Sequence, residues 1–277
     1  MSIFLQSQRL HSTRGGERIM GLCSIALLFP LFAFHVVADE DAVDESKAWQ
    51  QRRQAEFAEY AILQSGQDGE VAAEFETNSL LNWSNPIRRS PAGAVYLWTI
   101  AGRPQLIAST YPYVGGIEQE LTSLSELPLQ ARREEADVHR FPPGIEWQQF
   151  AEADAPVKSR SLRLTQMRRL AERFRVSGAL DGNHFEARLL TQPIYRSPVD
   201  SDADIAIFAF VQGTDPEAVL LIEAEGTTRF RYALARMTVV AITGDLDDIR
   251  VWDLPNCWPD RKSPDQPFRT IQLPGSH

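Results

Sequence analysis

Short apolar runs, each closed by a turn rich in glycine or proline, are the feature that most limits the fold of this chain. The runs cover residues 94–100, 105–111, 117–124, 145–150, 185–192, 204–212, 218–224, 228–242 and 249–253. Such short connections favour antiparallel hairpins over crossover helices. Phe230 and Tyr232 alternate with Arg229 and Arg231, as in a sheet that turns one face to the core. The pattern predicts a curved, largely antiparallel sheet of about eight strands.

Two segments depart from this strand pattern. Apolar side chains recur at helical spacing over residues 159–174, between Pro156 and Gly178. Residues 39–64 are rich in Ala, Glu, Gln and Arg, and they predict an N-terminal helical extension. We therefore expect an α+β fold in which one amphipathic helix packs on the sheet. No internal repeat is visible in the sequence.

The N-terminal forty residues resemble a secretory signal. Arg9, Arg14 and Arg18 precede an uncharged run over residues 19–38, which ends in Ala38 before acidic residues. We expect cleavage after Ala38 and export to the periplasm or cell envelope. The alternative is an uncleaved membrane anchor, because a bilayer core needs about 20 residues of helix.

The expected organisation is a signal peptide at 1–38, a helix and linker at 39–70, one α+β domain at 71–255 and an irregular, Pro-rich tail at 256–277. After cleavage Cys257 is the one remaining cysteine, so no internal disulfide can form. We expect it to be exposed in the tail. The whole chain carries a net charge of −9, which disfavours nucleic acid as a partner. We expect contact with a membrane only through an uncleaved N-terminal segment.

The motifs of common enzymes are missing. The sequence has no G-x-S-x-G nucleophile elbow, no phosphate-binding loop and no H-E-x-x-H, and it predicts no cofactor and no metal site. Residues 200–204 have the alternate Asp spacing of a calcium loop, but Ile205 and Val211 stand where such a loop needs Gly and Glu. A solvated turn is the simpler interpretation. Catalysis is therefore less expected than binding.

Charged residues beside apolar positions give the candidate ligand-binding set. Arg160 and Arg163 fall near the apolar stripe of the helix at 159–174, so each must leave the core, pair with a carboxylate or face a cleft. The set itself comprises Arg163, Tyr195, Arg196, Asp215 and Glu217. One interpretation is a non-catalytic interaction protein that binds an unknown envelope protein or a small ligand. The alternative is a small-molecule pocket protein, or a hydrolase that uses carboxylates near the turn at 213–217. A pocket lined by Arg163, Tyr195 and the Asp215 hairpin would favour the alternative.

Four stretches carry a resemblance to a protein family. They are Trp98 with Gly102-Arg103-Pro104, then residues 163–168, 189–196 and 208–217. Together they resemble an uncharacterised family of exported planctomycete proteins, over about residues 80 to 253. That family has no assigned activity, cofactor or catalytic residue. The resemblance implies only a single domain in an exported protein.

Overall fold

The computed structural model describes residues 40–66, 69–85, 90–134, 136–180, 182–263 and 266–274, and residues 40–277 form one compact unit. The expected signal peptide lies outside the described residues. Within the described ranges, no helix is both long and apolar enough to cross a membrane.

The first part of the unit contains one helix and a set of antiparallel strands. Its elements are α1 (Glu40–Ala58), β1 (Tyr60–Gly66), β2 (Gly69–Ala72), β3 (Glu74–Phe75), β4 (Leu81–Asn85), β5 (Ser90–Ile100), β6 (Arg103–Tyr113), β7 (Gly116–Ser123), β8 (Leu129–Arg133), β9 (Ala136–Phe141) and β10 (Gln148–Gln149). The order β9-β8-β1-β2 forms one sheet. The order β3-β5-β6-β7 forms most of a second sheet, and β4 pairs with β5.

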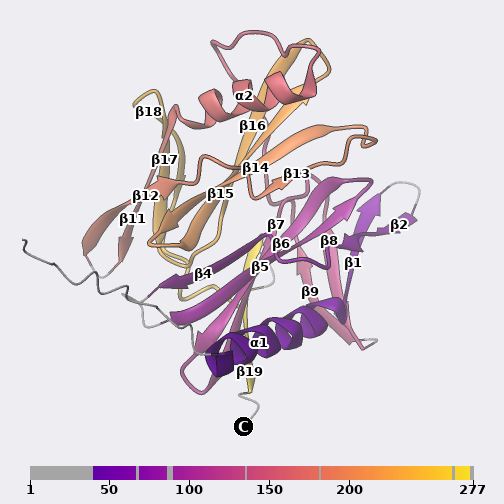
Figure 1. The fold of residues 1–277 in the computed structure, drawn as a ribbon, viewed down its shortest axis with the longest axis vertical. Helices are drawn as coiled ribbons and strands as arrows, with labels where there is room; N and C mark the ends of the chain where they lie inside the picture. Colours follow the sequence, from indigo (N-terminus) through magenta and orange to yellow (C-terminus); the bar gives the residue numbers. More distant parts are fainter. Residues whose placement is uncertain are drawn as a thin grey trace, which may run out of the picture. The chain divides into compact units, whose positions relative to one another are not determined.

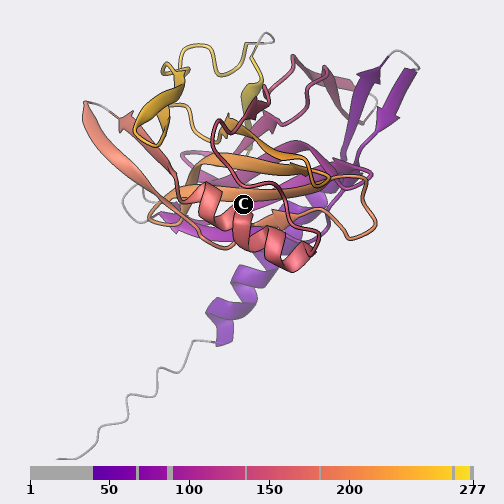
Figure 2. The same ribbon diagram turned by 90° about the horizontal axis from the view of Figure 1, so that it is seen from above.

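The second part repeats this succession. Its elements are α2 (Arg160–Ala171), β11 (Phe174–Leu180), β12 (Asn183–Leu189), β13 (Tyr195–Arg196), β14 (Asp204–Gln212), β15 (Asp215–Glu225), β16 (Arg229–Arg236), β17 (Ala241–Leu246), β18 (Ile249–Leu254) and β19 (Phe268–Pro274). One sheet runs β10-β16-β15-β14-β12-β11-β17-β18, and β13 pairs with β14. Figures 1 and 2 show α2 lying across the strands of this sheet.

The two parts are structural repeats, which we call the first repeat (residues 40–150) and the second repeat (residues 160–274). Leu97 pairs with Ile107 in the first, and Ala209 pairs with Val219 at the same place in the second. The strand bulges also correspond. They fall at Trp98/Thr99 and Phe210/Val211, and again at Ala131/Arg132 and Gly244/Asp245. The expectation of no internal repeat was therefore wrong.

Burial, and not residue identity, is what the repeats share. Over residues 92–100 and 204–212, aligned by this register, only Ala94 and Ala206 are identical. In both strands alternate side chains are nevertheless buried on each face of the sheet, which is the property that fixes strand register. A structural repeat that shares only its pattern of apolar residues cannot be detected by comparing residue identities.

Three clusters of buried side chains fill the unit. One packs under α1 and includes Phe57, Tyr96 and Trp98. Another packs under α2 and includes Met167 and Phe208. The third, which we call the inner core, joins the facing sheets of the two repeats. Its members include Val95, Leu97, Ile107, Ile205, Ile207, Val219 and Leu221.

The ends of the two repeats are exchanged. Strand β10, at the end of the first repeat, pairs with β16 of the second, and β19 at the end of the second pairs with β7 of the first. The tail at 256–277, expected to be irregular, therefore contains a strand. Phe268 and Thr270 are buried in this strand, and buried and more exposed side chains alternate along it. The Pro-rich composition of the tail hid this pattern. Cys257 is buried as well, contrary to the expected exposure.

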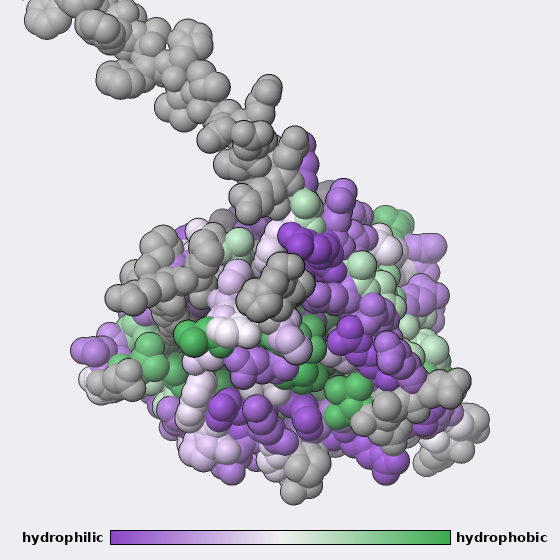
Figure 3. All heavy atoms as spheres, turned by 90° about the horizontal axis from the view of Figure 1, so that it is seen from below, coloured by the Kyte–Doolittle hydropathy of each residue, from purple (hydrophilic) through white to green (hydrophobic). Residues whose placement is uncertain are grey.

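The expected α+β class with a curved antiparallel sheet is correct, but the details differ. The described strands form three sheets where one was expected. The helix expected over 39–64 ends at Ala58, because Tyr60 and Ile62 are buried on one face of β1 and pair with β8. The run at 145–150 forms only the two-residue β10, and the run at 228–242 divides into β16 and β17. The surface seen from below is mainly hydrophilic, with small separate apolar areas (Figure 3).

Candidate functional site

The five residues predicted from the sequence lie in three separate places. Arg163 and Arg196 gather where α2 begins, beside Asp204 at the start of β14, whereas the Tyr195 side chain packs against the inner core. Asp215 lies after the other end of β14, because Gln212 and Asp215 close the β14–β15 hairpin. The strand's length keeps the groups apart, so no common pocket lined by Arg163, Tyr195 and the Asp215 hairpin forms among the hollows described below.

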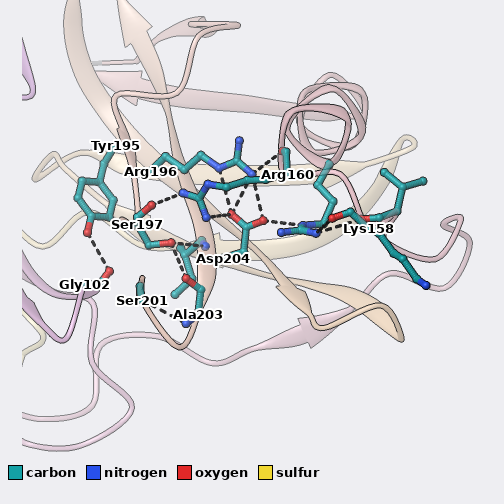
Figure 4. Close-up of polar contacts among 12 residues, drawn as sticks. Gly102, Lys158, Arg160, Tyr195, Arg196, Ser197, Ser201, Ala203 and Asp204 are labelled. Atoms are coloured by element: carbon teal, nitrogen blue, oxygen red, sulfur yellow. Dashed lines mark hydrogen bonds and ion pairs between the residues drawn. The ribbon is translucent and has the colours of Figure 1, made fainter. Parts of the chain in front are cut away.

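Three arginines converge on one carboxylate, and we call them with it the arginine cluster: Arg160, Arg163, Arg196 and Asp204 (Figure 4). Arg163 Nε lies 2.6 Å from Asp204 Oδ2, and Arg160 Nη1 lies 3.1 Å from Asp204 Oδ1. Arg196 donates from Nε and Nη2 to the two carboxylate oxygens, each at 3.0 Å. Of the alternatives expected for Arg160 and Arg163, pairing with a carboxylate is the one that the structure shows.

The same guanidinium groups also bind backbone carbonyls. Arg163 Nη1 donates to the carbonyls of Val157 and Lys158 at 3.0 and 2.8 Å. Arg160 donates to the carbonyl of Ser197, and Arg196 donates to that of Arg160. These contacts fasten the start of α2 to β13 and β14. The cluster is therefore part of the fold as well as a charged site.

The charges of the arginine cluster do not balance. Three guanidinium groups share one carboxylate, which leaves two positive charges over, and the side chains of the arginines are 15–25% exposed. Burial lowers the pKa of Arg196, an effect that Asp204 opposes and that Arg160 and Arg163 reinforce. Asp200 and Asp202 are exposed on the adjoining loop, but neither forms an ion pair with the cluster. An added anion would reduce this repulsion.

The first repeat serves as an internal comparison for the cluster. Strand register places Asn82 and Ala92 at the positions of Arg196 and Asp204. The corresponding strands thus pair in the first repeat with an amide in place of the guanidinium and no carboxylate in place of Asp204. The pairing of β13 with β14 therefore does not depend on this ion pair.

Tyr195 has a different role from its arginine neighbours. Its hydroxyl donates to the carbonyl of Gly102 at 2.8 Å, and burial raises its pKa. Ser201 Oγ donates to the carbonyl of Ala101 nearby. Tyr195 therefore holds the β5–β6 turn against the loop that follows β13.

Asp215 and Glu217 belong to a buried acidic group between the repeats. Asn85 Nδ2 donates to Asp215 Oδ2 at 3.1 Å. Tyr111 donates its hydroxyl to Glu120 at 3.0 Å, and burial followed by the charge of Asp215 raises the pKa of Glu120 well above its usual range. Glu217 is fully buried, so a substrate cannot reach this group without opening the two sheets. Sequence reasoning missed Glu120, because its run was interpreted only as a strand.

Several hollows open at the surface. A groove of about 460 Å³ follows α2 past Arg169, Leu170 and Phe230, and one of about 410 Å³ passes Phe174 and Phe210 on the other side of the helix. In the part of the chain that the structure describes, no three His, Cys, Asp or Glu side chains are placed to hold a metal ion.

We compared the chain with protein families, curated proteins and solved structures. No family model, no curated protein and no solved structure matches the chain.

Proposed function

We propose that this chain is a non-catalytic binding protein whose arginine cluster takes an anionic group of its partner. The observation that carries the proposal is the two positive charges left over where Arg160, Arg163 and Arg196 share Asp204. A planar guanidinium presents paired donors to an oxyanion, which an ammonium group cannot do. The Arg160 and Arg163 side chains remain partly exposed, so an anion can approach them.

The net charge of the chain limits the size of that anion. At −9 the chain as a whole repels polyanions, so a partner such as nucleic acid is disfavoured. A single carboxylate or phosphate group on an envelope protein or a small ligand meets the local positive charge without a large opposing field. The burial of Asp215 and Glu217 disfavours the alternative of a hydrolase at the 213–217 turn.

Inorganic phosphate, titrated at constant ionic strength, tests this proposal. We expect saturable shifts of the arginine Nε–H NMR signals of Arg160, Arg163 and Arg196. The variant Arg160→Gln should weaken binding about tenfold, since one charge-assisted hydrogen bond is lost. The matched control is Arg175→Gln, because Arg175 is 55% exposed and, among the described residues, forms an ion pair only with Asp248. Shifts that do not saturate, or equal weakening by the two variants, would refute the proposal.

The proposal places the protein in the periplasm or cell envelope after removal of residues 1–38. The basic start and the apolar run that ends at Ala38 support export. N-terminal sequencing of protein from its own host should begin at Asp39. Recovery of Met1 in the membrane fraction would establish the uncleaved anchor instead.

A further inference from the structure

A small pocket lies where the two repeats meet, on the opposite face of β14 from the arginine cluster. It has a volume of about 170 Å³, and Gln64, Gln105 and Ser125 of the first repeat line it together with Ile205 and Leu221 of the second. Ile205 belongs to the inner core, whereas Asp204 before it faces α2. We call this hollow the junction pocket.

One wall of the junction pocket is apolar and another carries neutral polar groups. Ile205 and Leu221 are fully or almost fully buried beneath it. Gln64 Nε2 donates to Gln105 Oε1 at 2.5 Å and to Ser125 Oγ at 2.9 Å. An amide and a hydroxyl each offer both donor and acceptor atoms. A ligand with an apolar face and an edge of hydroxyl groups would match both walls.

Of the charged side chains that line the pocket, Arg103 is paired and Glu126 is exposed to solvent. Arg103 donates from both terminal nitrogens to Glu223, at 3.2 and 2.6 Å. Arg231 also pairs with Glu223, and its guanidinium carbon lies 4.5 Å from the ring centroid of Trp147, which lines the pocket. Trp147 Nε1 is buried and donates no hydrogen bond within the described residues. The pocket therefore suits a neutral molecule better than an ion.

Trp83 of the inner core offers an internal reference for Trp147. Its indole packs so tightly on Gly93 that a Cβ there would overlap it, and Trp83 Nε1 donates to Ser109 Oγ at 3.2 Å. Trp83 is only 4% exposed, so its space is filled and a ligand cannot reach the ring.

We propose that the junction pocket binds a single neutral sugar residue. A pyranose has the required form: a compact ring, an apolar face for the half-buried Trp147 and the exposed Leu127, and hydroxyl groups for Gln64, Gln105 and Ser125. The site is separate from the arginine cluster, so either proposal can fail without the other.

The methyl glycosides of glucose, galactose and mannose are the probes. The full chain is labelled with 5-fluorotryptophan, and the signal of Trp147 is assigned by its loss in Trp147→Phe. We expect at least one glycoside to shift that signal saturably, with a dissociation constant in the range of about 1 to 10 mM, typical for a ligand of so few atoms. The signal of Trp83, whose space is filled, should not move.

Gln64→Leu should weaken that binding at least about tenfold, because it keeps the size of the side chain and removes its hydrogen bonds. Gln51→Leu, at an exposed position of α1, is the matched control and should bind like wild type. Arg160→Gln should also leave glycoside binding unchanged. If no glycoside saturates the Trp147 signal by about 50 mM, or if Gln64→Leu binds like wild type, the proposal is wrong. A shift produced by indole but by no glycoside would overturn it equally.

Discussion

Asp204 is the carboxylate that the three arginines of the arginine cluster share. Its side chain is 10% exposed and neutralises part of the charge of three arginines. Removal of a carboxylate from such a site leaves buried cations without a partner, which costs far more than the loss of an exposed pair. The sequence offered a carboxylate partner as one of the alternatives for Arg163. It did not indicate which one, because Asp204 comes close only through the pairing of β13 with β14.

Asp204→Asn should therefore lower the free energy of unfolding by roughly 3 kcal/mol. The matched control is Asp247→Asn, which should cost no more than about 1 kcal/mol. Asp247 is 49% exposed, and its one ion-pair partner in the described part of the chain is Arg173. Urea unfolding followed by circular dichroism measures both. Equal losses in the two variants would show that the arginine cluster adds nothing beyond an ordinary surface pair.

Cys257 shows how burial changes an expectation made from composition. The residue is 6% exposed, and its backbone N–H donates to the carbonyl of Val239 at 2.8 Å. Burial raises the pKa of its thiol, which disfavours the reactive thiolate. We predict slow reaction with a disulfide reagent at pH 8 in the native protein and fast reaction in urea. Cys257→Ser should cost about 1–2 kcal/mol, and a fast native reaction would contradict the placement of this segment.

At the scale of elements, the sequence predicted the strands and the helix whose own residues carry a clear periodic pattern. The β5–β6 hairpin, β14 and α2 were found within a few residues of their bounds, because each has a strong period and clear turn residues. Strands β1, β8, β11 and β19 were missed. Each is stabilised by partners distant in the chain, as β19 is by β7, and short runs without strong alternation carry no signal for such pairing.

His139 links two of these elements and makes their contact sensitive to acid. Arg269 Nη1 of β19 lies 2.6 Å from His139 Nδ1 of β9. Burial, then the charge of Arg269, lowers the pKa of His139 to about 4. The unfolded chain protonates its histidine near pH 6.5, so this contribution to stability is complete above pH 6.5 and is lost as the pH falls towards 4.

His139→Gln keeps a hydrogen-bond acceptor but cannot titrate. Between pH 7 and pH 4 the wild type should therefore lose roughly 2 kcal/mol more of its unfolding free energy than the variant does. The comparison cancels Glu118 and Glu120, whose raised pKa values act in the opposite direction and are common to both proteins. Parallel pH profiles of the two proteins would rule out this role of His139.

At the scale of the whole molecule, the repeats are one folding unit. The inner core places Val95, Leu97 and Ile107 of the first repeat against Ile205 and Leu221 of the second. A separated repeat would expose that face, at about 1.5–3 kcal/mol for each large apolar side chain. Each repeat also needs the other for a complete sheet, because β10 pairs with β16 of the second repeat and β19 pairs with β7 of the first. The junction pocket exists only in this arrangement, because residues of both repeats line it.

Fragments 40–157 and 158–277, expressed separately, should each fail to fold, and a mixture of the two should restore a folded complex of equal proportions. The reason is that the free energy of unfolding of a domain is only about 5–15 kcal/mol. Exposing the inner core and losing an exchanged strand would together cost more than that. Circular dichroism and size-exclusion chromatography follow the reconstitution. The control is the intact chain cleaved at a protease site inserted in the exposed segment at 151–155, which should keep the melting temperature of the uncut protein. A cooperative thermal transition in either fragment alone would show that the repeats are independent domains and that the inner core is an interface between them.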